Sequence, residues 1–367
     1  MLLTIYAERW HANNINMAPS MKKTQLKDLT LKELEALAEK HGEKKFRGRQ
    51  LFTWMYKNGA QKYDDMQNVP LKFRKVLQET ATIQPLTIDA IQGSPEKGTE
   101  KFLFRLHDGL QIESVLMYND DRRTLCISSQ VGCAVDCKFC ATGAMGIKRN
   151  LTQGEIIEQV IQVQRHSDVK VTNVVAMGMG EPFLNYDALM DALEIVTSEN
   201  GMGIGRKHIV VSTSGILPGI KKFITQKRPY KLAISLNATT DESRTTLMPL
   251  NKKWPIRDLM QAATEYTRTT SERITFEYVL LAGVNDTSAD AWRLCTLVKG
   301  IRCKVNLIPY NTTARDFKKP TEDAVLDFYK WMKPADVPVT IRWSKGADID
   351  AGCGQLLVTQ SSSPPTG

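Results

Sequence analysis

The sequence predicts an α/β protein in which a partial (β/α)6 barrel follows a small N-terminal helical domain. From residue 124 onward, short aliphatic runs of strand length alternate with amphipathic segments of helical period. Short loops join these segments, a pattern typical of β/α units around a parallel sheet. Six such units can be identified, and a closed eight-unit barrel would need two more. We therefore expect a barrel that is only partly closed.

The N-terminal part of the chain has a different pattern. Residues 1–23 are expected to be an extension, and residues 24–90 a helical accessory domain. Thr30 and Glu33 have the spacing of a capping box, which marks the start of a helix. Residues 91–123 follow as a linker.

The linker is predicted to be a β-hairpin. Its two strands are expected at residues 99–106 and 110–117, where polar and apolar residues alternate on either side of a His-Asp-Gly turn. This hairpin would connect the helical domain to the barrel.

The barrel is assigned to residues 124–345. The final segment, 346–367, is predicted to be a loop that bears one cysteine, followed by a disordered tail ending in SSSPPTG. The barrel strands are expected at 124–130, 171–178, 208–214, 231–237, 273–281 and 304–310, and the helices near 152–165, 187–197, 217–225, 255–268, 286–299 and 321–333.

The composition favours a cytoplasmic protein with an anionic partner. Of the 367 residues, 42% are hydrophobic and 24% are charged, as in ordinary globular proteins. No run approaches the ~20 apolar residues that span a bilayer, so no membrane partner is expected. Glu8 and Arg9 interrupt the region in which a signal peptide would be apolar. The net charge of +9 favours a nucleic-acid partner. We expect the protein to be a monomer.

A basic segment, KKFRGRQLFTWMYK, lies in the helical domain. Lys44, Lys45, Arg47 and Arg49 are interleaved there with aromatic residues. Basic side chains can neutralise phosphates and aromatic side chains can stack on bases. The alternative is an ordinary amphipathic helix with its aromatic residues in the core. The pattern favours the core for the aromatic residues and leaves both interpretations open for the basic ones.

Three cysteines within eight residues, Cys133, Cys137 and Cys140, are the strongest sign of chemistry in the chain. Fe–S clusters take thiolate ligands, and three cysteines leave one iron of a four-iron cube open to a ligand from outside the protein. A structural zinc site is the alternative, because Cys126 is near enough in sequence to be the fourth ligand. The odd number of cysteines, seven, disfavours a disulfide framework.

Polar and glycine-rich segments follow several of the predicted strands. The carboxyl ends of parallel strands meet on one face of a barrel, so these segments should gather around the three-cysteine loop. Each alone is a weak signal, since Ser and Asn are common in turns and helix caps. Together they would offer hydrogen bonds to a ligand with an amine, a carboxylate and a ribose. The segments are 177–182, 212–215, 235–237 and 310–311.

The Cys-x3-Cys-x2-Cys loop is similar to the signature of radical S-adenosylmethionine (SAM) enzymes. The wider sequence resembles the RlmN/Cfr family of radical SAM RNA methyltransferases, through TLCISSQVGC, MGMGEP, VSTSGILP, NLIPYN and DIDAGCGQL in the same order. The resemblance covers about residues 25 to 357. It implies that the helical domain, residues 24–90, is an RNA-binding domain, which favours RNA contact for the basic residues of segment 44–57. It implies a 4Fe–4S cluster on Cys133, Cys137 and Cys140, with two SAM molecules used per turnover. The SAM contacts that it implies are Gly180, Glu181, Ser212, Ser235, Leu236, Asn237 and Asn311.

The resemblance also implies three catalytic residues outside the cluster loop. Cys353, in DIDAGCGQL, corresponds to the cysteine that carries the methyl group, and Cys126, in TLCISSQ, to the cysteine that later attacks it. Glu113 corresponds to the proton acceptor. In this scheme one SAM methylates Cys353 and a second generates the radical that joins the methyl carbon to RNA. A Cys126–Cys353 disulfide then releases the product and is reduced again.

The expected reaction is methylation of C2 of an adenine in 23S rRNA, and also of an adenine in tRNA. The expected electron source is a low-potential donor such as flavodoxin or ferredoxin. Cfr enzymes, which methylate C8 of adenine, are the nearest alternative, although the GEP, NKKWP and NLIPYN segments resemble the C2 enzymes more closely. A non-catalytic Fe–S protein that binds RNA or senses redox state is a further alternative.

Overall fold

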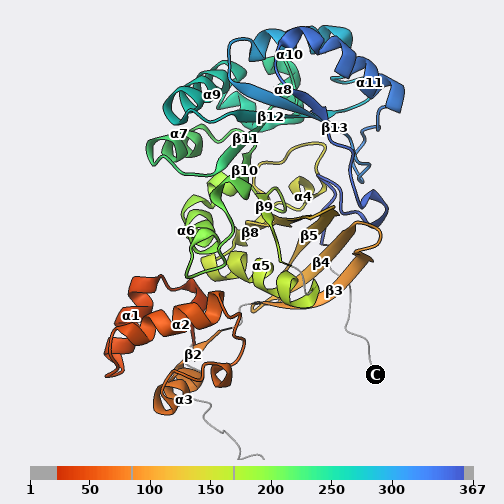
Figure 1. Cartoon of the computed structure of the whole chain (residues 1–367). Coiled ribbons are helices and arrows are strands. Elements are labelled where there is room, and N and C mark those ends of the chain that lie inside the picture. Colours follow the sequence, from red (N-terminus) through yellow and green to blue (C-terminus); the bar gives the residue numbers. More distant parts are fainter. Residues whose placement is uncertain (1–22, 84–85, 168–169, 359–367) are drawn as a thin grey trace, which may run out of the picture.

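The structure is a computed structural model that describes residues 23–83, 86–167 and 170–358. Most of the predicted extension and the tail after residue 358 lie outside the described residues. The main feature is one sheet of ten strands, in the order β14-β13-β12-β11-β10-β9-β6-β5-β4-β3. Helices pack along this sheet, and the helical domain lies at one end of the molecule (Figure 1).

Seven neighbouring strands are parallel and form the predicted partial barrel, with six β/α units. The sheet does not close, because β14 at one edge and β3 at the other do not pair. The short strand β14 was not predicted, since three residues carry no clear period. None of the described helices is long and apolar enough to cross a membrane. The parallel strands are β6 (Arg122–Ile127), β9 (Asn173–Ala176), β10 (Ile209–Thr213), β11 (Lys231–Ser235), β12 (Ile274–Leu280), β13 (Cys303–Pro309) and β14 (Val339–Ile341). The helices of the units are α5 (Gln153–Ser167), α6 (Tyr186–Thr197), α7 (Leu217–Thr225), α9 (Ile256–Thr270), α10 (Ser288–Val298) and α11 (Glu322–Trp331), and the short α8 (Asp241–Leu247) follows β11.

Three antiparallel strands extend this sheet: β3 (Leu86–Ser94), β4 (Thr99–Leu106) and β5 (Gln111–Asn119). β4 and β5 are the two strands of the predicted hairpin. β5 also pairs with β6, where Val115 lies opposite Cys126. The hairpin is therefore continuous with the barrel sheet, and β3 begins within the range assigned to the helical domain.

The first predicted barrel strand, 124–130, consists of two elements. β6 ends at Ile127, and β7 (Gln130–Gly132) pairs instead with β8 (Ile147–Asn150) in a separate two-stranded sheet. The cysteine loop and the one-turn helix α4 (Ala141–Ala144) lie between these two short strands. The small sheet therefore closes the base of the loop.

The N-terminal domain contains α1 (Leu31–Lys40), α2 (Phe46–Tyr56) and α3 (Leu71–Thr80). The predicted capping box of α1 is confirmed. The Thr30 hydroxyl accepts from Glu33 N–H at 3.3 Å, and the Glu33 carboxylate accepts from Thr30 N–H at 2.7 Å. These bonds satisfy two backbone donors that a helix start leaves free.

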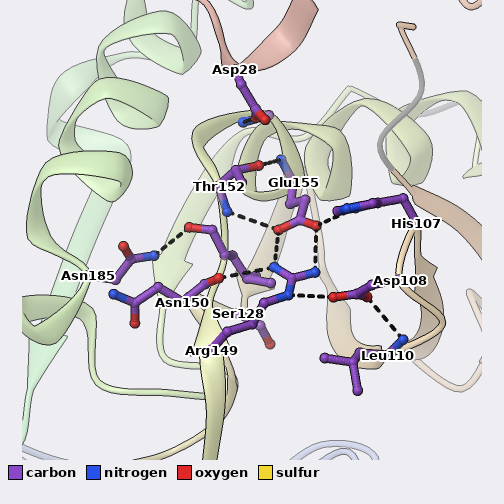
Figure 2. Close-up of polar contacts among 12 residues, drawn as sticks. Asp28, His107, Asp108, Leu110, Ser128, Arg149, Asn150, Thr152, Glu155 and Asn185 are labelled. Carbon is purple, nitrogen blue, oxygen red and sulfur yellow. Dashed lines mark hydrogen bonds and ion pairs between the residues drawn. The ribbon is translucent and has the colours of Figure 1, made fainter. Parts of the chain in front are cut away.

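Buried polar contacts attach the helical domain to α5. Lys27 and Glu158 form an ion pair in which both side chains are fully buried. Asp28 accepts a hydrogen bond from Gly154 N–H at 3.0 Å, at the start of α5 (Figure 2). Burial lowers the pKa of Lys27, so its charge depends on the carboxylate of Glu158.

A second polar cluster fixes the β7–β8 sheet to α5 (Figure 2). Arg149 of β8 donates to both oxygens of Glu155, at 2.7 and 2.9 Å, and to Asp108 at 2.6 Å. Thr152 N–H also donates to Glu155, at 2.9 Å. Because Glu155 is buried, the guanidinium neutralises a charge that would otherwise be costly. The cluster thereby holds the base of the cysteine loop.

The chain after β14 crosses the open edge of the barrel toward the antiparallel strands. Lys345 donates to the carbonyl of Tyr118 on β5, at 2.8 Å. Gly93 on β3 lies so close that a Cβ there would stand 2.8 Å from the Ile349 side chain. The segment 343–358 therefore covers the gap that the open sheet leaves, and it brings Cys353 to the interior.

Candidate active site

The inner face of the parallel sheet surrounds a cavity of about 520 Å3. Alternate residues of each strand line it, because successive side chains of a strand point to opposite faces. On β13, Lys304, Asn306 and Ile308 face the cavity, whereas Val305 and Leu307 are fully buried in the core. The carboxyl ends of the strands and the cysteine loop form one end of the cavity, and the amino ends of the strands form the other.

The cysteine loop contributes Cys137 and Cys140 to the cavity wall, and Cys133 lies half-buried beside them. Cys133 N–H donates to the carbonyl of Gly146 at 3.0 Å, and Cys140 N–H donates to that of Cys137 at 3.1 Å. Asp136 has a left-handed backbone with φ of 53°, which turns the loop back on itself.

The donor set fits an iron–sulfur cluster. Burial raises the pKa of Cys133 to about 12, and burial with the neighbouring thiols raises that of Cys137. Thiols grouped this way become thiolates when a cationic metal centre compensates their charge. Among the described residues no three His, Cys, Asp or Glu side chains converge as they would around one metal ion. A cube takes one thiolate per iron, so its three thiolates need not converge on one ion, whereas the ligands of a tetrahedral zinc site must do so.

Some of the residues predicted to contact SAM make contacts within the protein instead. Glu181 is buried and accepts from Ser214 N–H at 2.8 Å and from the Thr213 hydroxyl at 2.7 Å. It ties the loop after β9 to the end of β10 and does not line the cavity. Gly180 has φ of 101°, and a Cβ there would stand 2.5 Å from the Gln130 side chain. Glycine is therefore needed at that position.

Ser235 and Asn237, two of the residues predicted to contact SAM, line the cavity. The Asn237 side chain is already occupied, since its oxygen accepts from Val279 N–H at 2.9 Å. Leu236 is fully buried between them. Asn311 donates to the carbonyl of Cys353 at 3.1 Å, so it positions the Cys353 loop in this conformation.

Arg244, which the sequence did not single out, holds the strand ends together. Its fully buried guanidinium donates to the carbonyls of Leu236 at 3.0 Å, Ser214 at 2.7 Å and Ser235 at 3.2 Å. Burial lowers its pKa to about 10, and the nearby Cys137 acts in the opposite direction. No local sequence pattern indicates that an arginine in a short helix will be buried against the strand ends.

Glu277 is a second residue that the sequence did not single out. It lies on β12, faces the cavity and accepts from the Ser212 hydroxyl at 2.8 Å through one carboxylate oxygen. The other oxygen, Oε1, is buried without a hydrogen-bond partner among the described residues, and Arg342 is 4.0 Å away. A charged residue at an inward position of the apolar strand ITFEYVL was the available signal.

Cys126 and Cys353 line the same cavity, although 226 residues lie between them in the sequence. Cys126 lies on β6 and is buried, whereas Cys353 is exposed because it faces the cavity. Burial raises the pKa of Cys126 to about 12, with Cys353 the next cause, and burial raises that of Cys353 to about 11. The zinc interpretation needed Cys126 beside the cysteine loop, whereas Cys126 interacts electrostatically with Cys353, Arg342 and Glu277.

Glu113 lies in a second cavity, behind the Cys353 loop. It forms an ion pair with Lys101 at 3.1 Å and accepts from Leu357 N–H at 2.9 Å. Burial raises its pKa, and Lys101 opposes that shift. The segment 350–358 separates the two cavities: Cys353 faces the first, and Leu357 faces the second.

Comparisons with known proteins place these features in a class. Residues 127–294 match the radical SAM superfamily, and residues 24–83 match the ribosomal RNA large subunit methyltransferase N-terminal domain. The crystal structure of a radical SAM methyltransferase from Sphaerobacter thermophilus is 44% identical, with a TM-score of 0.87 over 91% of this chain and 99% of that one. The partial barrel and the three-cysteine loop are therefore those of a radical SAM enzyme, a class that uses a 4Fe–4S cluster and SAM.

Curated relatives identify the family within this class. The dual-specificity RNA methyltransferase RlmN of Anaeromyxobacter sp. (strain Fw109-5) is 45% identical over 349 residues, which cover 93% of this chain and 92% of that protein. The protein of the same name from Geotalea uraniireducens (strain Rf4) is 44% identical over 337 residues, covering 92% and 97%. The chain belongs to the RlmN family of RNA methyltransferases.

Proposed function

We propose that this protein methylates C2 of an adenine in 23S rRNA, and of an adenine in tRNA, through a methylated Cys353. One observation carries the proposal: Cys353 and Cys126 line the same cavity as Cys137 and Cys140 of the cysteine loop. The methyl carrier, the releasing thiol and the cluster loop thus share one space. The dual specificity named for the relatives supports two kinds of RNA substrate.

The carboxyl end of the cavity would hold the cofactors. Cys133, Cys137 and Cys140 would ligate the cluster, and Ser235 and Asn237 would form part of the wall against SAM. When bound, the cluster and SAM supply the methyl group and the electron chemistry that activates it, with two SAM molecules per turnover and flavodoxin or ferredoxin as the electron donor. The remaining predicted contacts, Gly180, Glu181, Ser212, Leu236 and Asn311, would shape this wall from behind.

Cys353 would accept the methyl group on its sulfur. Asn311 holds the backbone carbonyl of Cys353 and leaves the thiol free to face the cavity. The reactive form is the thiolate, and burial raises the pKa of this thiol to about 11, while Arg342 acts in the opposite direction. A cationic methyl donor in the cavity would favour the thiolate further.

Cys126 would act last, by attacking the sulfur of Cys353. The bond from that sulfur to the transferred carbon breaks, and the carbon keeps the bonding electron pair and takes up a proton, which completes the methyl group on the RNA. A Cys126–Cys353 disulfide remains to be reduced. Burial raises the pKa of Cys126 to about 12, which keeps this thiol protonated and unreactive during the earlier methyl transfer.

Glu113 would accept the proton that the modified adenine loses. In the conformation described here, Lys101 and Leu357 N–H occupy its carboxylate. Displacement of the segment 350–358 would open the second cavity to the first and release Glu113. The raised pKa of Glu113 makes its carboxylate a stronger base than an ordinary surface carboxylate, which suits a proton acceptor.

The test is a nucleoside assay. RNA treated with cluster-loaded protein, SAM and reductant is digested and measured by mass spectrometry, with a cytoplasmic RNA extract and purified tRNA as substrates. We expect 2-methyladenosine, and none with Cys353→Ala, which should still carry the cluster. Formation of 8-methyladenosine alone would support a Cfr-type reaction, and retained methylation by Cys353→Ala would refute the proposed carrier.

A further inference from the structure

The end of the cavity opposite the cysteine loop is basic. Arg122 begins β6, Lys231 begins β11 and Lys304 is the second residue of β13, so all three lie at amino ends of parallel strands. Lys207 lies just before β10. All four side chains line the cavity, and we call these four residues the basic mouth.

The residues of the basic mouth form no ion pair among the described residues. Glu277 is the one carboxylate among the described cavity-lining residues, and its ion pair is with Arg342, at 4.0 Å. None of the described ion pairs includes a residue of the basic mouth. The cavity therefore carries a positive surplus at the end that faces away from the cysteines.

The cations of the mouth are close enough to repel one another. The pKa of Lys304 is lowered by burial first and then by the charges of Lys231, Arg342 and Arg122, with Glu277 acting in the opposite direction. Like charges gathered without an anion raise the free energy of the protein, and a bound anion removes that cost. Phosphates bind to such groups of cations, with release of their own counterions.

In the basic segment of the helical domain, by contrast, most cations have an acidic partner. Glu35 contacts Arg49 at 2.7 Å and Lys45 at 3.4 Å, and Arg47 lies 3.7 Å from Glu43. Three of the four cations predicted to contact RNA are thus already paired. Of the aromatic residues of this segment, Phe52 and Tyr56 are buried and follow the core interpretation, whereas Phe46 is exposed and does not.

The dimensions of the cavity suit a nucleotide that enters from the basic mouth. A strand rises ~3.3 Å per residue, so Lys304 and Ile308 on β13 are separated by roughly 13 Å along the cavity wall. Enzymes that modify a base usually extract its nucleotide from the stack. Trp343, an exposed aromatic residue that also lines the cavity, offers a surface on which a base can stack.

We propose that the basic mouth binds the phosphates that flank the target adenine, so that RNA approaches from the amino ends of the strands while SAM lies at the carboxyl ends. This inference rests on the proposed function and adds the side from which the substrate arrives. It assigns the main electrostatic contact to the barrel and not to the basic segment of the helical domain.

The test compares two double variants of the full-length, cluster-loaded protein. Lys231→Ala/Lys304→Ala removes two charges from the mouth, and Lys44→Ala/Lys57→Ala removes two exposed charges from the helical domain. The probe is a fluorescent RNA stem–loop with an unpaired adenine in its loop, titrated at several salt concentrations. For the mouth variant we expect at least tenfold weaker binding and a salt-dependence slope smaller by about 1.4, or about 0.7 for each lost phosphate contact on a single strand.

Further measurements separate the possible failures. Methylation of Cys353 by SAM without RNA, seen as a mass increase, should equal that of the unmutated protein in both double variants. Lys231→Arg/Lys304→Arg, which preserves charge, should retain RNA affinity. If the unmutated protein neither binds nor methylates the stem–loop, the proposed function fails. If it does both and the mouth variant binds like the helical-domain variant, the inference about the mouth is wrong.

Discussion

The hydroxyl of Thr142 donates a hydrogen bond to the carbonyl of Leu356 at 2.6 Å, across 214 residues of sequence. A backbone hydrogen bond from Ala141 N–H to the carbonyl of Gly354, at 2.8 Å, runs beside it. These bonds join the end of the cysteine loop to the segment that carries Cys353. The position of one loop therefore depends on that of the other.

Thr142→Val should loosen the Cys353 loop. The substitution keeps the side-chain shape and leaves the Leu356 carbonyl without its partner, which costs about 1–2 kcal/mol. That cost corresponds to an increase of roughly 5- to 30-fold in the open population of the loop. Hydrogen exchange of residues 350–358 and the alkylation rate of Cys353 measure it. Thr142→Ser retains the hydroxyl and is the control; equal rates in both variants would contradict the prediction.

Glu277→Gln should weaken SAM binding by about tenfold or more. Oε1 of Glu277 has no hydrogen-bond partner among the described residues and belongs to a side chain that faces the cavity, where a cationic ligand would supply a donor. Hydrogen bonds to charged groups contribute about 1.5–3 kcal/mol. Glutamine can still accept from the Ser212 hydroxyl. Calorimetric titration of the cluster-loaded protein with SAM, without RNA, measures the change. An unchanged dissociation constant would mean that SAM does not contact Glu277.

Alkylation of Cys353 should depend on pH over an unusual range. The thiolate is the reactive form, and the pKa of Cys353 is about 11 where an ordinary thiol has 9.0. Below the pKa the thiolate fraction rises about tenfold for each pH unit, so the rate with iodoacetamide should keep rising to pH 10. Mass spectrometry of the Cys353 peptide from protein without SAM gives this rate. A plateau just above pH 9 would show an unshifted thiol.

Lys27→Met should destabilise the attachment of the helical domain by about 3–5 kcal/mol. It leaves the fully buried carboxylate of Glu158 without its cation, which is more costly than losing the pair as a whole. Lys27→Met/Glu158→Met removes both charges and should recover most of the loss. Denaturant unfolding of all three proteins measures the difference. If the single and double variants are equally stable, the unpaired carboxylate of Glu158 carries no cost, and the prediction is wrong.

The repeating pattern of the chain was enough to predict the barrel. Strand and helix periods are local properties, so the six β/α units could be located from spacing alone. The short strand β14 (Val339–Ile341) and the separation of β7 from β6 depend on pairing with distant strands, and local pattern did not reveal them.

The predicted site residues fell into two groups once their side-chain directions were known. Cys126, Ser235, Asn237 and Cys353 face the cavity, whereas Glu181 is enclosed by its own hydrogen bonds. Residue types and resemblance indicate which segments surround a ligand. They do not indicate which way each side chain points, because that depends on the register of the neighbouring strands.

Local spacing and the family motifs were sufficient to indicate the kind of chemistry, because thiolates spaced like Cys133, Cys137 and Cys140 suit an Fe–S cluster and the motifs disfavoured the zinc alternative. The fold was needed to show that Cys353 and Cys126 line one cavity, that Glu113 lies behind the Cys353 loop, and that cations without an ion pair among the described residues gather at the far end of the cavity. Those relationships join residues far apart in the chain. They are set by strand register, by the crossing of the C-terminal segment and by which charges find a partner.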